Sequence, residues 1–136
     1  MRWSRMLVGV ALLMAGCAKT LPDQDLRITE ATPQVKVSAD ILWKDYQSDR
    51  SAADRQYHGK ALLVTGVITG IDKATPLAQF VMFGQADGKP PGVQANLLTD
   101  TADQVLAGLE PKQRITLKCF CDGLSTNLIL KSCTKP

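Results

Sequence analysis

Three cysteines lie close together near the end of the chain, in the segment KCFCDGLSTNLILKSC. Cys119, Cys121 and Cys133 could bind a metal, form a redox centre or form a structural disulfide, since each of these needs thiols close in space. A zinc site takes four ligands, and the fourth of the usual kind would have to be His58, far away along the chain. Catalytic redox pairs usually show Cys-x-x-Cys, whereas the spacing here is Cys-x-Cys. We therefore expect a structural disulfide and no metal site.

The rest of the sequence offers little for catalysis. The chain has one histidine, no recognisable nucleophile motif, no phosphate-binding glycine loop and no obvious pair of carboxylates. We expect a protein that is not an enzyme, with no catalytic residues and no cofactor.

The start of the chain, MRWSRMLVGVALLMAGCAKT, indicates the compartment. Arg2 and Arg5 give a basic region, residues 6–14 an apolar stretch and residues 15–16 a small-residue cleavage site, which is the order of a secretory signal peptide. The apolar stretch is shorter than the ~20 residues of a spanning helix. The run LMAGC resembles the lipobox of bacterial lipoproteins, in which the cysteine, here Cys17, carries the lipid. The alternative is a plain signal peptide with an incidental cysteine.

The lipobox resemblance implies that residues 1–16 are removed and that Cys17 becomes the acylated first residue. Two or more acyl chains make a membrane attachment durable. Ala18 follows the cysteine where an Asp would indicate retention at the inner membrane. We therefore expect a lipid anchor in the cell envelope, at the outer membrane facing the periplasm, where neighbouring thiols oxidise.

The charge of the chain argues against a nucleic-acid partner. Without Arg2 and Arg5, 14 of the 16 basic residues remain against 13 acidic ones, so the formal net charge falls from +3 to about +1. A nucleic-acid binder is usually more basic and concentrates its charge, whereas Lys and Arg are scattered singly here. A solvated surface of mixed sign is expected.

The helices and strands that carry the cysteines are predicted from periodicity. Residues 17–37 have no sustained period and are interpreted as a flexible tether. Ser38 suits the N-cap of a helical segment, either one helix broken near Ser48-Asp49 or two short helices. Five strands and a short helix after Thr99 or Asp100 follow; the strands are expected at 60–71, 79–84, 92–98, 114–120 and 127–133. Three strands, a helix and two strands is the element order of the OB-fold, a five-stranded Greek-key barrel.

Several segments between Ser38 and Cys133 follow a known family pattern: SADILWKDYQSDRSAADRQYHGK, VTGVITGI, GVQANL, ITLKCFCDGL and LILKSC. Through them the chain resembles the tRNA_anti-like family of OB-fold lipoproteins. The positions that match the family pattern are Leu42, Tyr46, Ala53, Asp54, Tyr57, Gly59, Lys60, Val64 and Gly66. The resemblance implies an OB-fold domain with a leading helix over residues 38–136. These motifs are structural and imply no particular activity.

The disulfide pairing has two alternatives. Alternation places Cys119 and Cys121 on one face of the fourth strand, and Cys133 ends the partner strand. The family pattern has a cysteine immediately before an x-Gly-hydrophobic turn, here Cys121, and a glycine is usual where Cys119 stands. The resemblance therefore implies a Cys121–Cys133 disulfide, with Cys119–Cys133 as the alternative. Closing a loop of ~13 residues would stabilise the fold by about 3 kcal/mol.

A ligand groove is expected on the second and third strands, across which OB-folds bind oligonucleotides and oligosaccharides. Its candidate lining residues are Phe80, Met82, Gln94 and Asn96. The expected role is a binding or scaffold module with an envelope protein or glycan as partner. Nucleic-acid or oligosaccharide binding is the alternative, but the former needs aromatic platforms in a basic groove. A purely structural envelope protein is a third possibility.

Overall fold

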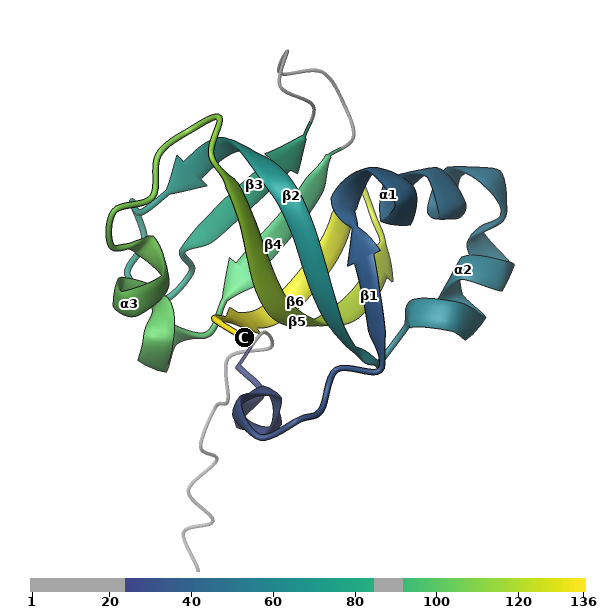
Figure 1. The fold of residues 1–136 in the computed structure, drawn as a ribbon, viewed down its shortest axis with the longest axis horizontal. Helices are drawn as coiled ribbons and strands as arrows, with labels where there is room; N and C mark the ends of the chain where they lie inside the picture. Colours follow the sequence, from purple (N-terminus) through teal and green to yellow (C-terminus); the bar gives the residue numbers. More distant parts are fainter. Residues whose placement is uncertain (1–23, 85–91) are drawn as a thin grey trace, which may run out of the picture.

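The computed structural model describes residues 24–84 and 92–136 (Figure 1). Its elements in chain order are η1 (Leu26–Thr29), β1 (Val35–Ser38), α1 (Ala39–Ser48), α2 (Arg50–Tyr57), β2 (Ala61–Asp72), β3 (Phe80–Gly84), β4 (Val93–Leu97), η2 (Thr99–Thr101), α3 (Ala102–Leu106), β5 (Arg114–Leu124) and β6 (Leu128–Thr134).

Strands β2 to β6 close into a five-stranded barrel. β2 pairs antiparallel with both β3 and β5, β3 with β4, and β5 with β6, while β4 and β6 are parallel. With α3 between β4 and β5, this is the OB-fold, and the predicted fold class is confirmed. The extra strand β1 adds to β2 in parallel register, Val35 opposite Leu62.

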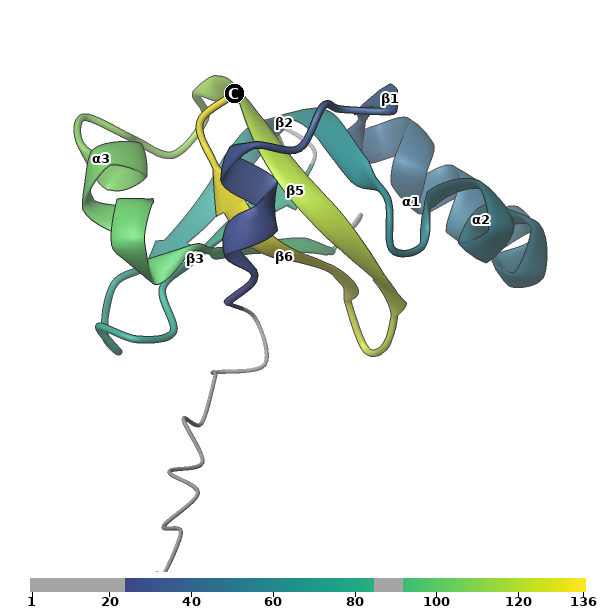
Figure 2. The ribbon, with the colours of Figure 1, turned by 90° about the horizontal axis from the view of Figure 1, so that it is seen from below.

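The leading helical segment forms two helices, the second of the two predicted alternatives. The side chain of Ser38 caps α1 by accepting from the Ile41 N–H. Asp49 is extended, its carboxylate accepts from the Ala52 N–H, and its own N–H donates to the Asp45 carbonyl. One residue therefore ends α1 and begins α2. Both helices lie at one end of the barrel, and α3 lies at the other (Figures 1 and 2).

Gly66 lies where β2 packs tightly against core side chains. A Cβ atom at this position would lie 2.8 Å from the Phe83 ring and 3.0 Å from the Ala39 Cβ. Phe83 and Ala39 are both buried in the core. Only a glycine lets the ring and the first turn of α1 pack against this part of the strand.

The flexible tether predicted for residues 17–37 is wrong for residues 24–37, which fold onto the barrel. Ile28 is fully buried with Ala61 and Leu98, and Lys118 Nζ donates to the Thr29 and Ala31 carbonyls, each at 3.2 Å. These partners are distant in sequence and η1 and β1 have four residues each, so no local period predicts them. Residues 17–23 lie outside the described residues.

The structure confirms a disulfide but corrects its pairing: Cys119 is bonded to Cys133, with 4.3 Å between their Cα atoms, and Cys121 is a free, buried thiol. The register explains the outcome. Cys121 lies opposite Leu130, so Cys133 is three residues further along β6, about 10 Å away and beyond disulfide reach. Between the pairs Lys118–Thr134 and Phe120–Lys131, two residues of β6 oppose Cys119 alone, which is a β-bulge.

Candidate ligand-binding face

The four predicted groove residues form two cross-strand pairs on the outside of the barrel. Phe80 lies opposite Asn96, and Met82 lies opposite Gln94. All four side chains are partly exposed, whereas their neighbours Val81, Phe83, Val93 and Ala95 are fully buried. We call this surface the β3–β4 face. Strand alternation positions it, because every second residue of β3 and β4 fills the core.

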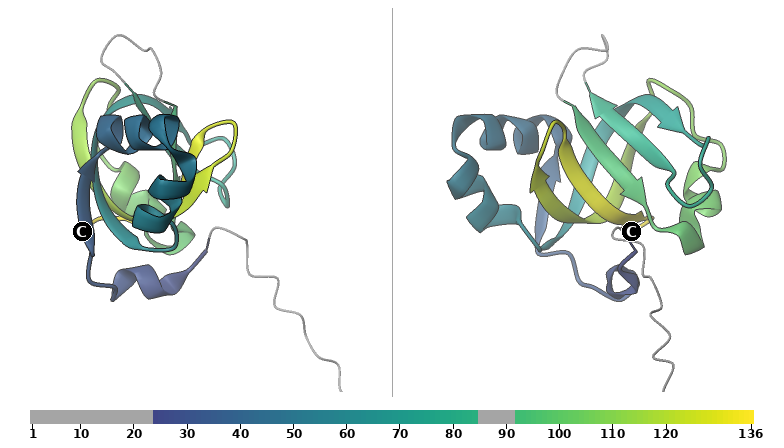
Figure 3. Two further views of the ribbon diagram at one scale, coloured as in Figure 1. Left: turned by 90° about the vertical axis from the view of Figure 1, so that its right-hand side faces the viewer. Right: turned by 180° about the vertical axis from the view of Figure 1, so that it is seen from behind.

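The β3–β4 face is not covered by the described helices. In the view from behind (Figure 3, right), β3, β4 and β6 lie at the front, with α1 and α2 beyond one end and α3 beyond the other. The face continues onto β6, whose Ile129 pairs with Gln94. A partner could therefore lie across three adjacent strands.

Carboxamides dominate the polar chemistry of the β3–β4 face. Gln94 Nε2 donates to Asn96 Oδ1 at 2.8 Å, and Asn127 Nδ2 donates to Gln94 Oε1 at 3.5 Å. A primary amide has two donor hydrogens and two acceptor lone pairs, so these bonds leave Gln94 with further capacity. Such groups hydrogen-bond equally well to hydroxyls and to peptide groups, while Phe80 and Met82 supply apolar contact beside them.

The face carries no formal charge on its two central strands. Neither β3 nor β4 contains an acidic or basic residue. On the adjacent β6, Lys131 Nζ lies 3.5 Å from Asp122 Oδ1, so its charge is compensated. The described residues of β3 and β4 therefore offer no cation to a phosphate backbone.

A second polar cluster joins α1, α2 and β5. The sequence contains its residues but gave no sign that they contact one another. The Tyr46 hydroxyl donates to Asp54 Oδ1 at 2.9 Å and lies 3.4 Å from Cys121 Sγ, and the Tyr57 hydroxyl donates to Asp45 Oδ2 at 2.6 Å. Burial is the main cause that raises the pKa of the Cys121 thiol, and it raises the pKa of Tyr57 to about 12 with help from Asp45.

This cluster holds the two helices onto the barrel and is not suited to chemistry. Tyr46 and Tyr57 are buried, their rings are 6.3 Å apart, and Cys121 has no exposed surface. A buried thiol with a raised pKa is unreactive at neutral pH. His58, the candidate fourth metal ligand, is exposed. Among the described residues no group of three or more His, Cys, Asp or Glu side chains is placed to hold a metal.

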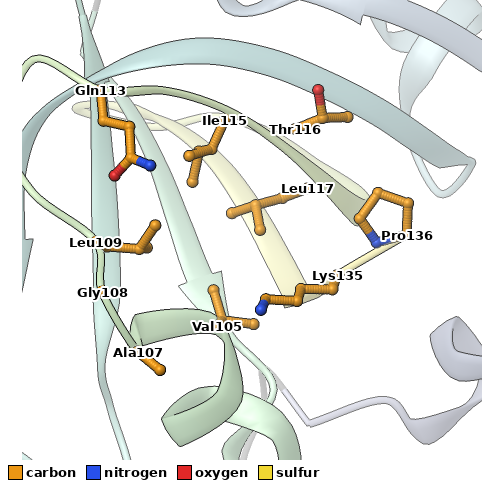
Figure 4. Close-up of a pocket in the computed structure, with 10 residues that line it drawn as sticks. All are labelled: Val105, Ala107, Gly108, Leu109, Gln113, Ile115, Thr116, Leu117, Lys135 and Pro136. Carbon is orange, nitrogen blue, oxygen red and sulfur yellow. The ribbon is translucent and has the colours of Figure 1, made fainter.

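A cavity of about 450 Å³ beside α3 was not foreseen (Figure 4). Val105, Leu109, Ile115 and Leu117 give it an apolar lining, and Gln113 and Lys135 lie on opposite sides of it. It is built from three separate segments of the chain, so no single motif could predict it. In the part of the chain that the structure describes, no helix is long and apolar enough to cross a membrane.

The barrel is an OB-fold, a fold typically used for binding, and its β3–β4 face is open. The chain belongs to the tRNA_anti-like family, whose family model matches residues 1–134. No curated protein matches it.

Two of the solved structures that are similar to this chain are OBody complexes. One is the OBody AM1L10 bound to hen egg-white lysozyme, at 16% identity and a TM-score of 0.43, covering 59% of this chain and 81% of the other. The second is the OBody AM3L09 bound to hen egg-white lysozyme, at 16% identity and a TM-score of 0.44, covering 60% and 88%.

Proposed function

We propose that this chain is a lipid-anchored binding protein of the bacterial cell envelope that performs no catalysis. In this proposal the β3–β4 face binds an envelope glycan or protein, and the lipid on Cys17 keeps the barrel at the outer membrane, facing the periplasm. The sequence LMAGC after a basic and apolar leader supports the anchor. The Cys119–Cys133 disulfide is in keeping with an oxidising compartment.

The observation that carries the binding role is the β3–β4 face itself. Two cross-strand pairs place an aromatic ring, a thioether and two carboxamides side by side on an uncharged surface. A neutral sugar offers hydroxyls for the amides and C–H faces for the ring of Phe80, and a peptide offers groups of the same kind. The absence of acidic and basic residues from β3 and β4 favours such partners over a nucleic acid.

Co-sedimentation with purified peptidoglycan sacculi tests the glycan partner, and crosslinking in intact cells tests the protein partner. We expect the detergent-solubilised lipoprotein to be retained by one of them. The double substitution Met82→Ala and Gln94→Ala should weaken that retention by about tenfold or more, the effect of losing central contacts of an interface.

A matched control is Thr65→Ala on β2. Like Gln94, Thr65 is a partly buried, outward-facing residue with a side-chain hydrogen bond, here 2.7 Å to Thr116 Oγ1. This variant should bind like the wild type. Equal binding by the double variant and the wild type would overturn the role of the face, and no retention by either partner would overturn the binding proposal.

A further inference from the structure

The first described residues are hydrogen-bonded at the ends of two barrel strands. Gln24 Nε2 donates to the Leu97 carbonyl at 3.2 Å, and Gln24 Oε1 accepts from the Thr99 N–H at 2.7 Å. The Asp25 N–H donates to Ser132 Oγ at 2.8 Å. The chain therefore enters the fold at one defined point, beside the C-terminal ends of β4 and β6.

Residues 24–31, which we call the strap, are part of the barrel from that point on. Ile28 is fully buried, and the two bonds from Lys118 Nζ close the end of the strap. Figure 2 shows η1 lying across β5 and β6. The strap cannot move away from the barrel without exposing Ile28 and leaving the buried ammonium of Lys118 unpaired, which is costly.

The connection to the proposed anchor is consequently short. Six residues lie between Cys17 and Gln24, and the seven residue-to-residue steps of a fully extended chain span at most ~25 Å. A domain of this size has a radius of gyration of about 14 Å, and so a diameter of roughly 35 Å. The connection is shorter than the domain is wide, whatever conformation it takes. A tether as far as Val37 would have reached about 70 Å.

We propose, resting on the anchor at Cys17 proposed above, that the strap holds the barrel against the bilayer in one orientation, with η1 toward the lipid. The exposed surface of η1 suits this contact, because Leu26 is 58% exposed and can enter the interfacial region. Arg27 beside it is paired with Asp25 at 2.6 Å, and this bond holds the pKa of the Asp25 carboxyl below its usual value. The contact therefore needs no anionic lipid.

The same orientation sets the β3–β4 face upright on the membrane. Asn96 directly precedes Leu97, to which Gln24 is bonded, so the Phe80–Asn96 end of the face lies nearest the bilayer. Helix α1 begins at the far end of β1 from η1 (Figure 1) and is held away from the lipid. A partner bound along β3 and β4 would extend outward from the membrane surface.

Fluorescence quenching by brominated lipid tests the orientation on the full lipoprotein in zwitterionic vesicles. A tryptophan introduced by Leu26→Trp should lose at least about twofold more emission than one introduced by Ile41→Trp, because only the former reaches the lipid interface. Ile41 is a matched control, since it is 54% exposed and lies in the first turn of α1. The native Trp43 on α1 provides the background signal in both variants.

A second variant separates the effect of tether length from the effect of η1 itself. Inserting a flexible Gly/Ser segment of about 20 residues between Cys17 and Gln24 should remove most of the preferential quenching, because the barrel can then turn freely. Equal quenching of the two introduced tryptophans without the insertion would overturn the orientation. An unchanged preference after the insertion would overturn the role given to the short connection. Flotation with vesicles reports the anchor separately: protein that fails to float lacks the anchor, and both proposals then fail.

Discussion

Cys121 is a buried thiol two residues from the disulfide-bonded Cys119, and the two sulfurs have different chemistry. The Cys119–Cys133 bridge ties β5 to β6, whereas Cys121 faces the hydroxyl of Tyr46. The bulge at Ser132, whose φ is 55°, brings Cys133 opposite Cys119. The bridge therefore depends on the register of β6 as well as on the cysteines themselves.

Substitution of single cysteines tests this assignment. Cys133→Ala should lower the free energy of unfolding by about 3 kcal/mol, because it opens the loop that the bridge closes between residues 14 apart in sequence. Cys121→Ala should keep the bridge and lower the free energy of unfolding by about 1 kcal/mol. Thiol titration in urea, with peptide mapping, measures the outcome. Free thiol in the wild type should be found at Cys121, and only after unfolding. A reactive Cys119 in the wild type would contradict the pairing.

The Tyr57 hydroxyl should make the fold sensitive to alkali. Its pKa is raised to about 12 in the folded chain, against about 10 in an unfolded chain, so the folded state binds its proton more tightly. That stability is complete below about pH 10 and is lost as the pH rises toward 12, by at most about 2 kcal/mol. Urea unfolding across this range measures the effect.

The control for this prediction is Tyr57→Phe, which removes the titrating group and the bond to Asp45. This variant should be less stable at neutral pH by about 1 kcal/mol and should lose less stability between pH 10 and 12. Parallel pH profiles for the two proteins would contradict the role given to Tyr57.

At the scale of elements, the packing of β2 against the core depends on Gly66. Gly66→Ala should lower the free energy of unfolding by about 1–3 kcal/mol, because its Cβ would overlap the Phe83 ring at 2.8 Å. Gly70→Ala on the same strand is the matched control, since its nearest neighbour would be Met82 Cβ at 3.8 Å, an ordinary contact. Thermal unfolding of both variants compares them, and equal stability would show that β2 does not need a glycine at position 66.

The five barrel strands and the helices could be predicted from the sequence, whereas η1 and β1 could not. The barrel strands and the helices show a local period, and the barrel follows from their order. η1 and β1 have four residues each and are stabilised by contacts with Lys118, Ala61 and Leu62. Contacts with distant residues determine their structure, so the sequence of residues 17–37 alone does not predict η1 and β1.

The candidate site, too, could be predicted only in part. Alternation within β3 and β4 was enough to place Phe80, Met82, Gln94 and Asn96 together on the outside of the barrel, because both strands are regular where these residues lie. The predicted disulfide pairing was wrong because a single bulge in β6 shifts every residue beyond it relative to β5. The cavity beside α3 joins side chains from three segments and has no local signal.

At the scale of the whole molecule, the scattered charge predicts no useful affinity for nucleic acid. Strands β3 and β4 lack Lys and Arg, and Lys131 is paired with Asp122. We expect oligonucleotide binding weaker than ~1 mM even at low salt, where electrostatic attraction is strongest. A salt titration of fluorescent single-stranded DNA and RNA measures this. Tight binding that weakens steeply with salt would favour a nucleic-acid function instead.

In the proposed function, a lipid on Cys17 ties this barrel to a membrane in the cell envelope. The mass of the protein extracted from membranes measures this modification. We expect a chain that begins at Cys17, carries a diacylglyceryl group with a further acyl chain, and contains one disulfide. A chain recovered from the cytosol with residues 1–16 still attached and Cys17 unmodified would contradict it.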